Sequence, residues 1–254
     1  MKSLPGLFFC YTENMNGTIW IISGIAILIT LLLTTGWWRY VLTGYLIARV
    51  TPYEQVGNDG GSILVIGDST GYGTGAARSG ESIAGRIGAD YPSNSITNNS
   101  VNGRKIAGAM EVAQGLTNAD RYDLIVLQIG ANDLIAGVDA DVVVSDLQQL
   151  IEAVIPHTQK IIVITAGNIG ATPLFAGDQA ARYTDASRQF DQQMTILGQT
   201  YDDMTFVSLF DEPGDDVFVQ SPNVYTSVDG LHPSSAGYQI WYDKAKSALV
   251  DVLE

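Results

Sequence analysis

The chain has 254 residues, of which 46% are hydrophobic and 16% are charged, so it is long enough for one sizeable globular core and an appendage. Its formal net charge is -14, which leaves no basic stripe to neutralise phosphates, and we expect no nucleic-acid partner. The single cysteine, Cys10, excludes an intrachain disulfide and zinc sites built on several cysteines.

Residues 18–38 are the first predicted element, a membrane-spanning helix. They carry no charge, and about 20 apolar residues cross the hydrocarbon core of a bilayer. Trp20 near one end and Trp37 and Trp38 at the other are typical of interfacial aromatic residues. A cleaved signal peptide is the main alternative, but no Ala-x-Ala site follows the run. We therefore expect a single-pass membrane protein, and the few flanking basic residues leave the side of its main domain open.

The chain is expected to consist of four parts. Residues 1–17 are an N-terminal segment, within which Met15 is an alternative start. Residues 18–38 are the anchor, and residues 39–60 are a juxtamembrane segment and a polar linker. The main domain is expected over residues 61–254.

From Ser62 onward, β-type and helix-type stretches alternate. This alternation predicts a three-layer α/β/α sandwich with a parallel, flavodoxin-like sheet of about five strands. Two of the runs are continuously apolar, as in strands that are buried on both faces. The predicted strands are Ile63–Ile66, Ser95–Val101, Leu124–Ile129, Lys160–Thr165 and Thr205–Phe210. The predicted helices are Ser82–Asp90, Ile106–Leu116, Val142–Val154, Ala181–Tyr201 and Ser234–Leu253.

Ser69 follows the first of these strands, in a turn rich in glycine. A hydroxyl at the carboxyl end of a buried strand, with backbone amides free around it, is how a nucleophilic serine is presented. Gly, Asp and Ser are also ordinary turn formers, so this turn alone does not establish catalysis.

Two further strand ends offer hydrogen-bond donors. Ligands of open parallel sheets bind at the carboxyl ends of the strands, near the switch in strand order. Gly103 can present its backbone amide there, and Asn132 can present its side-chain amide. With the amide of Ser69 they would form a three-donor oxyanion hole. Taken separately, Gly103 is explained as a turn glycine and Asn132 as a helix cap.

Asp229 and His232 lie just before the last predicted helix. An aspartate three residues before a histidine can accept a hydrogen bond from Nδ1–H, which leaves Nε2 to take a proton from a serine. The other histidine, His157, is expected in a solvated loop between a helix and a strand.

These residues together resemble the four sequence blocks of the SGNH (GDSL-type) hydrolase family, over about residues 61–254. The blocks are Gly67-Asp68-Ser69, Gly103, Gly130-Ala131-Asn132-Asp133 and Asp229-Gly230-Leu231-His232-Pro233. The resemblance implies Ser69 as nucleophile, His232 as base and Asp229 as its orienting acid. It also implies Ser69, Gly103 and Asn132 as oxyanion donors. Thr70 stands where many members have Leu.

Residues 67–71 also satisfy Gly-x-Ser-x-Gly, the nucleophile elbow of α/β-hydrolases. In that fold several strands precede the elbow and the acid and base lie on separate loops. Here only the predicted anchor precedes the serine strand, and the acid and base are three residues apart. This context argues against the α/β-hydrolase assignment.

Two loops are expected to shape a substrate pocket. Residues 166–175 follow the fourth strand and are small or apolar, which favours a short acyl group. Residues 211–228 contain Asp211, Glu212, Asp215 and Asp216, which lack EF-hand spacing and are interpreted as a solvated acidic loop.

We therefore expect a membrane-anchored serine esterase that cleaves carboxylic esters through an acyl-serine intermediate. The substrate is a small-molecule, lipid or glycan ester, and neither a metal nor an organic cofactor is required. Two alternatives stay open: a catalytically idle binding module on the same fold, and acyl transfer to a sugar or another alcohol.

Overall fold

The computed structural model describes residues 7–34, 38, 41, 44–45 and 49–253. The chain divides into two compact units, Met1–Leu42 and Thr43–Glu254. The first unit contains α1 (Leu7–Thr34). In the part of the chain that is described, no helix has the length and apolar character needed to cross a membrane. Residues 35–37 of the expected anchor lie outside the described residues, and the anchor stays a prediction.

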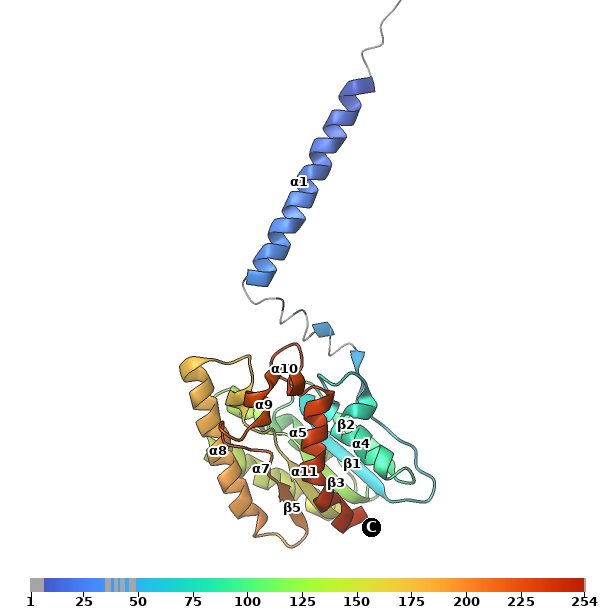
Figure 1. Ribbon diagram of the computed structural model, residues 1–254. Coiled ribbons are helices and arrows are strands. Elements are labelled where there is room, and N and C mark those ends of the chain that lie inside the picture. The colour runs from blue at the N-terminus through green and yellow to red at the C-terminus, as the bar shows by residue number, and fades with distance from the viewer. Residues whose placement is uncertain (1–6, 35–37, 39–40, 42–43, 46–48, 254) are drawn as a thin grey trace, which may run out of the picture. The chain divides into compact units, whose positions relative to one another are not determined.

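The second unit is built on a five-stranded sheet in which every pairing is parallel (Figure 1). The strand order is β2-β1-β3-β4-β5, which is the flavodoxin-like order expected from the sequence. Gly67 at the end of β1 pairs with Ser100 of β2 and with Gln128 of β3, so these three strands end at one level. The strands are β1 (Ser62–Gly67), β2 (Ser95–Ser100), β3 (Tyr122–Gln128), β4 (Thr158–Ile164) and β5 (Met204–Val207).

Alternate residues of the strands enter two separate cores, one on each face of the sheet. On β3, Ile125 and Leu127 pack against α5 (Ile106–Gly115), α7 (Ala140–Val154) and α8 (Gly177–Gly198). Leu124 and Val126 face the other way, toward α4 (Ile83–Asp90) and α11 (Ser235–Leu253). Because both faces are covered, β1, β3 and β4 each contain a continuous buried apolar run, and the predicted three-layer α/β/α arrangement is confirmed.

Short elements fill the connections between these layers, and the sequence pattern did not predict them. Periodicity needs a longer window than one turn of helix, which explains why they were missed. They are α3 (Ser69–Tyr72), η1 (Ser79–Glu81), α6 (Ala131–Ile135), η2 (Ile155–His157), η3 (Ile169–Ala171), α9 (Val217–Gln220) and α10 (Pro222–Tyr225).

Part of the stretch expected as a linker packs on the sheet edge. Gln55 forms an antiparallel bridge with Ile96 of β2, and its side chain donates to the carbonyls of Tyr91 and Asn94 at 3.1 and 2.8 Å. Val50 is buried as well. The compact unit therefore includes these residues, which precede residue 61.

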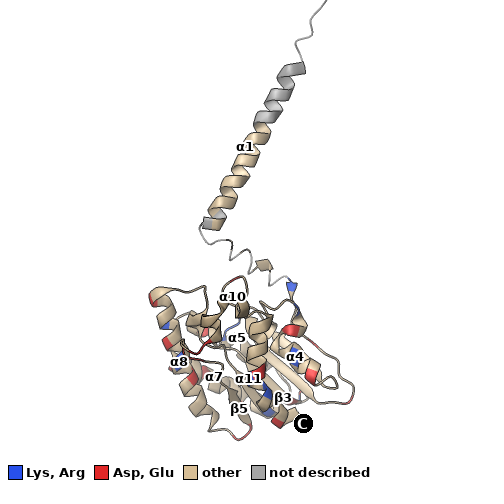
Figure 2. Ribbon diagram, viewed as in Figure 1, with Lys and Arg blue, Asp and Glu red and all other residues tan. Residues whose placement is uncertain are grey.

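Two expectations about polar residues are wrong. His157 is only 8% exposed, because it sits in η2 with Nδ1 3.1 Å from the carbonyl oxygen of Asp120. The region 211–228 is not a fully solvated loop, since it contains α9 and α10, and Asp216 is only 3% exposed as the N-cap of α9. Acidic residues nevertheless lie on several surface elements, α8 among them (Figure 2).

Candidate active site

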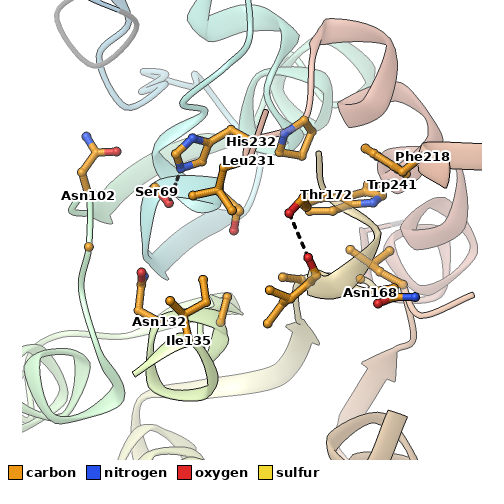
Figure 3. Close-up of a pocket in the computed structure, with 18 of the residues that line it drawn as sticks. Ser69, Asn102, Asn132, Ile135, Asn168, Thr172, Phe218, Leu231, His232 and Trp241 are labelled. Atoms are coloured by element: carbon orange, nitrogen blue, oxygen red, sulfur yellow. Dashed lines mark hydrogen bonds between the residues drawn. The ribbon is translucent and has the colours of Figure 1, made fainter. Parts of the chain in front are cut away.

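The turn after β1 presents Ser69 at the first position of α3. Asp68 caps this short helix, because its Oδ1 accepts the Thr70 backbone N–H at 2.8 Å. The backbone N–H of Asp68 bonds to the carbonyl of Gln128 at 2.9 Å, which ties the turn to the end of β3. Ser69 is thus held at the carboxyl edge of the sheet, half-buried, with its side chain directed into a pocket (Figure 3).

Gly75 lets the nucleophile loop approach the loop that carries His232. Its φ of 96° lies in the left-handed region. A Cβ at this position would come within 2.4 Å of the Pro233 carbonyl oxygen and 2.9 Å of the His232 Cβ. Only glycine fits here, and this close contact brings together two loops that are far apart in the sequence.

Ser69, His232 and Asp229 form one hydrogen-bonded chain. His232 Nε2 lies 2.9 Å from Ser69 Oγ, and His232 Nδ1 lies 2.6 Å from Asp229 Oδ2. The other carboxylate oxygen of Asp229 accepts the backbone N–H groups of Leu231 and His232 at 2.9 and 3.1 Å. The histidine and the aspartate are 6% and 1% exposed. This arrangement can pass a proton from the serine hydroxyl to the imidazole and stabilise the imidazolium that results.

The Asp229 carboxyl stays ionised in this environment. Burial raises its pKa. The hydrogen bond and the charge of His232, together with two backbone N–H donors, lower the pKa by more than burial raises it, so the net shift is downward. The aspartate therefore acts as a fixed negative partner for the imidazole.

Gly103 occupies a tight turn after β2, closed by a hydrogen bond of 3.1 Å from the Arg104 N–H to the Val101 carbonyl. Its φ is 74°, and a Cβ there would meet no atom within 4 Å. Among the described residues, its own N–H has no hydrogen-bond partner, and Gly103 lines the same pocket as Ser69. The neighbouring Asn102 is held by Thr74, whose hydroxyl donates to Asn102 Oδ1 at 2.5 Å.

Asn132 lines the pocket next to Ser69 and Gly103, but its amide also makes protein contacts. Nδ2 donates to the Arg104 carbonyl at 3.1 Å and lies 3.5 Å from Asp68 Oδ2. The first bond ties Asn132 to the Gly103 turn. The second is long and therefore weak, so a substrate oxygen can replace Asp68 Oδ2 as the acceptor of that N–H. The next residue, Asp133, has a structural role, since its Oδ2 accepts the Ile106 N–H at the start of α5.

Asp68 is a buried carboxylate for which the sequence pattern predicted no role. Burial raises its pKa above the ordinary value, and the hydrogen bonds from the Thr70 backbone and hydroxyl oppose that shift. Thr70, the residue that departs from the usual family pattern, donates its hydroxyl to Asp68 Oδ1 at 2.8 Å. A single carboxylate thus connects the turn of Ser69 with Asn132.

The site opens into a pocket of about 220 Å³ at the carboxyl ends of the strands. Ala166, Gly167 and Ile169 of the expected pocket loop line it. Three apolar lining residues, Leu209, Phe218 and Trp241, were not predicted from the sequence. Phe218 lay in a region interpreted as solvated, and Trp241 in a helix whose apolar residues are typical of a core, so neither carried a signal for a binding site.

No group of three or more His, Cys, Asp or Glu side chains in the described ranges is arranged to hold a metal ion. Three of the four carboxylates at residues 211–216 have other partners: Asp211 accepts from Lys244 at 2.7 Å, Glu212 accepts from Arg188 at 2.6 Å, and Asp216 caps α9.

The fold is similar to several solved structures. A lipolytic protein of the G-D-S-L family from Veillonella parvula aligns with a TM-score of 0.59 and 18% identity, covering 74% of this chain and 98% of that one. An acetylxylan esterase from Geobacillus stearothermophilus aligns at 0.52 and 18%, covering 78% and 96%. A lipase/acylhydrolase from Enterococcus faecalis aligns at 0.53 and 15%, covering 76% and 97%.

No curated protein sequence matches the chain. The model of the GDSL-like Lipase/Acylhydrolase family matches residues 65–240, which include Ser69, Gly103, Asn132, Asp229 and His232. The chain therefore belongs to the GDSL-like Lipase/Acylhydrolase family and is a hydrolase that acts on esters.

Proposed function

We propose that the protein cleaves carboxylic esters through a covalent acyl-serine intermediate formed on Ser69. The observation that carries this proposal is the continuous chain from Ser69 Oγ to His232 Nε2 at 2.9 Å and from His232 Nδ1 to Asp229 Oδ2 at 2.6 Å. It provides a nucleophile, a general base within reach of its proton, and an ionised partner for that base.

In the first half of the reaction, Ser69 Oγ attacks the carbonyl carbon and its proton moves to His232 Nε2. The carbonyl oxygen becomes an oxyanion, for which the amides of Ser69 and Gly103 and the Asn132 side chain are the donors. When the tetrahedral intermediate collapses, the bond to the alkoxy oxygen breaks and His232 returns the proton to that oxygen. The alcohol then leaves, and the acyl group remains on Ser69.

In the second half, a water molecule replaces the alcohol. His232 takes a proton from the water as its oxygen attacks the acyl carbon, and the same donors hold the second oxyanion. The acyl-oxygen bond to Ser69 then breaks, and the proton passes back to Ser69 Oγ. The products are a carboxylic acid, the alcohol and the regenerated enzyme.

The test is fluorophosphonate labelling and ester hydrolysis by the full chain in detergent, beside the Ser69→Ala variant. We expect Ser69→Ala to lose both labelling and nearly all turnover. Ser145→Ala, on the exposed side of α7, is the matched control and should behave as the unmodified protein. Turnover that survives in Ser69→Ala would overturn the proposal. If the folded protein is neither labelled nor active, the domain is an idle binding module.

A second assay separates hydrolysis from acyl transfer. Adding an acceptor alcohol to the reaction tests which nucleophile resolves the acyl-enzyme. Free carboxylic acid as the main product supports hydrolysis, whereas a transesterified product formed in preference to the acid would identify an acyltransferase.

We also propose that residues 18–38 anchor the protein in a membrane. Support comes from the charge-free sequence and from its terminal tryptophans. The test compares the full chain with a variant that lacks residues 1–42 and retains the compact unit from Thr43. Carbonate-resistant pelleting with membranes is expected only for the full chain, and equal release of both proteins would contradict the anchor.

A further inference from the structure

The pocket has two chemically different ends, with Ser69 between them. Figure 3 shows Asn102 and Asn132 on one side of Ser69, while Phe218, Trp241 and Asn168 lie toward the other end. The first side holds the donors assigned to the oxyanion. The second side is an arm with mainly apolar walls.

The walls of this apolar arm come from four elements that the fold brings together. Ala166 follows β4, Leu209 follows β5, Phe218 belongs to α9 and Trp241 to α11. The ring centroids of Phe218 and Trp241 are 5.8 Å apart. Tyr238 packs edge-on against Trp241, with 5.9 Å between the ring centroids. Trp241 and Leu209 are 7% and 3% exposed, so the arm ends against side chains that the core holds in place.

Two small residues, Ala166 and Gly167, also line the pocket. A Cβ at Gly167 would lie 2.7 Å from the Leu209 carbonyl oxygen, so glycine lets the two loops after β4 and β5 pack closely at the wall of the arm. In the sequence these small residues favoured a short acyl group. In the folded chain the same pocket is also lined by Leu209, Phe218 and Trp241, which offer apolar surface to a longer acyl group.

The reaction decides which part of an ester enters this arm. The carbonyl oxygen must face Gly103 and Asn132, and the alkoxy oxygen must stay near His232 Nε2 to receive its proton. The alcohol must also depart before water can attack, and a blind arm would retain it. The acyl group, in contrast, stays covalently attached to Ser69 through both halves of the reaction.

We propose that the arm binds the acyl chain of straight-chain fatty acyl esters longer than acetyl, with Trp241 as its end wall. This inference rests on the proposed acyl-serine mechanism. Burying one methylene group contributes about 0.8 kcal/mol, which is about four-fold in kcat/KM. The kcat/KM of p-nitrophenyl esters should therefore rise about four-fold for each added methylene, until the chain reaches Trp241.

Asp216 adds a second selectivity at this end of the pocket. It lines the pocket, and its Oδ1 accepts the Phe218 backbone N–H at 2.8 Å. No Lys or Arg is among the described residues that line the pocket, and Lys244, whose charge acts on Asp216, is already paired with Asp211 at 2.7 Å. A second carboxylate on the far end of an acyl chain would therefore meet this acidic group without a free cation to bind it. We expect half-esters of dicarboxylic acids to be much poorer substrates than neutral esters of the same length.

The experiment measures kcat/KM of the full chain for p-nitrophenyl acetate, butyrate, hexanoate, octanoate and decanoate. Trp241→Ala should move the optimum to a longer chain, because it removes the end wall. Ala166→Leu, which narrows the arm, should lower octanoate turnover at least ten-fold more than acetate turnover. Fluorophosphonate labelling of Ser69 in each variant verifies that it is folded. Tyr242→Phe, on the same helix but outside the pocket, is the matched control and should keep the original profile.

Three results would overturn the inference and leave the serine mechanism intact. The first is a higher kcat/KM for acetate than for all longer acyl groups. The second is a decrease in kcat/KM by the same factor for every ester in Trp241→Ala and Ala166→Leu. The third is a kcat/KM that depends on the length of the alcohol chain of alkyl acetates instead of the acyl chain. Loss of fluorophosphonate labelling at Ser69 would instead mean that the proposed function itself fails.

Discussion

The Thr70 hydroxyl donates a hydrogen bond of 2.8 Å to Asp68 Oδ1, next to the bond that the Thr70 backbone makes to the same oxygen. Asp68 Oδ2 in turn faces Asn132 Nδ2, whose shorter bond goes to the Arg104 carbonyl. The turn that carries the nucleophile and a residue assigned to the oxyanion hole therefore share one buried carboxylate. A leucine at position 70 could not supply this hydroxyl.

Thr70→Val, which keeps the shape but removes the hydroxyl, should destabilise the fold and reduce catalysis. A hydrogen bond to a charged group contributes roughly 1.5–3 kcal/mol, and we expect a loss of that order in the free energy of unfolding. Without the hydroxyl, Asp68 would be held less firmly and would position the Asn132 amide less well. The variant should therefore show a larger decrease in kcat than change in KM.

Thr70→Ser is the control, because it retains the hydroxyl. It should recover most of both the stability and kcat in urea unfolding and steady-state assays. If Thr70→Val and Thr70→Ser have equal kcat values, the hydroxyl has no positioning role.

Asn132→Ala should lower kcat by roughly 10²–10³ and change KM little, as expected when one oxyanion donor is removed. Asn132→Asp has almost the same shape but brings a negative charge to the developing oxyanion and to Asp68, so it should be at least as impaired. Steady-state kinetics on the preferred ester tests both variants. An Asn132→Asp protein more active than Asn132→Ala would show that the side chain acts by shape rather than by donating.

The sequence could predict where three of the proposed site residues lie, because they follow the ends of strands. The positions of Ser69, Gly103 and Asn132 follow directly from parallel strands that end at one edge of a sheet, as β1, β2 and β3 do. Asp229 and His232 were found because their local spacing alone permits the bond of 2.6 Å. Long strands and helices were recognised for a similar reason, since their apolar patterns extend over many residues.

The remaining features depend on tertiary contacts that leave no local pattern. Thr70 looks like any turn residue, and only the fold shows that Asp68 is buried beside Asn132. Trp241 and Phe218 of α9 line the pocket together, with ring centroids 5.8 Å apart, and a four-residue helix such as α9 has no periodicity that predicts this contact. His157 was misjudged because its partner, the Asp120 carbonyl, lies 37 residues away.

Gly103→Ala and Gly137→Ala form a matched pair that separates backbone strain from catalysis. Both glycines have positive φ, 74° and 82°, and a methyl group added at either position would meet no atom within 4 Å. Each substitution should therefore cost about 1–2 kcal/mol of stability through left-handed strain alone. Only Gly103 lines the pocket, so only Gly103→Ala should also lower kcat, by about 10- to 100-fold, as its amide turns away from the oxyanion.

Urea unfolding and steady-state kinetics on the two variants provide the comparison. Equal activity in Gly103→Ala and Gly137→Ala, at equal stability, would remove the Gly103 amide from the set of oxyanion donors.

Asp68→Asn should change the pH dependence of stability in a direction that the raised pKa of Asp68 determines. A carboxyl with a higher pKa in the folded than in the unfolded chain binds its proton more tightly when folded, so its ionisation destabilises the fold. This loss is absent below the ordinary pKa of 3.8 and grows as the pH rises above it. Asparagine cannot ionise, so the stability of Asp68→Asn relative to the unmodified protein should increase as the pH rises above about 4, until the folded-state pKa of Asp68 is passed.

Asp90→Asn provides a control of opposite sign. The hydrogen bond and charge of Lys246, together with the Tyr242 hydroxyl, hold the pKa of Asp90 below its ordinary value. Its ionisation therefore stabilises the fold, and that contribution is lost as the pH falls through the folded-state pKa. The stability deficit of Asp90→Asn should therefore be nearly constant above about pH 4 and should shrink as the pH falls below the ordinary pKa of 3.8, in a urea series extended to lower pH. If the difference between Asp68→Asn and the unmodified protein stays constant above about pH 4, while Asp90→Asn shows its change below about pH 4, burial of Asp68 does not disfavour its charge.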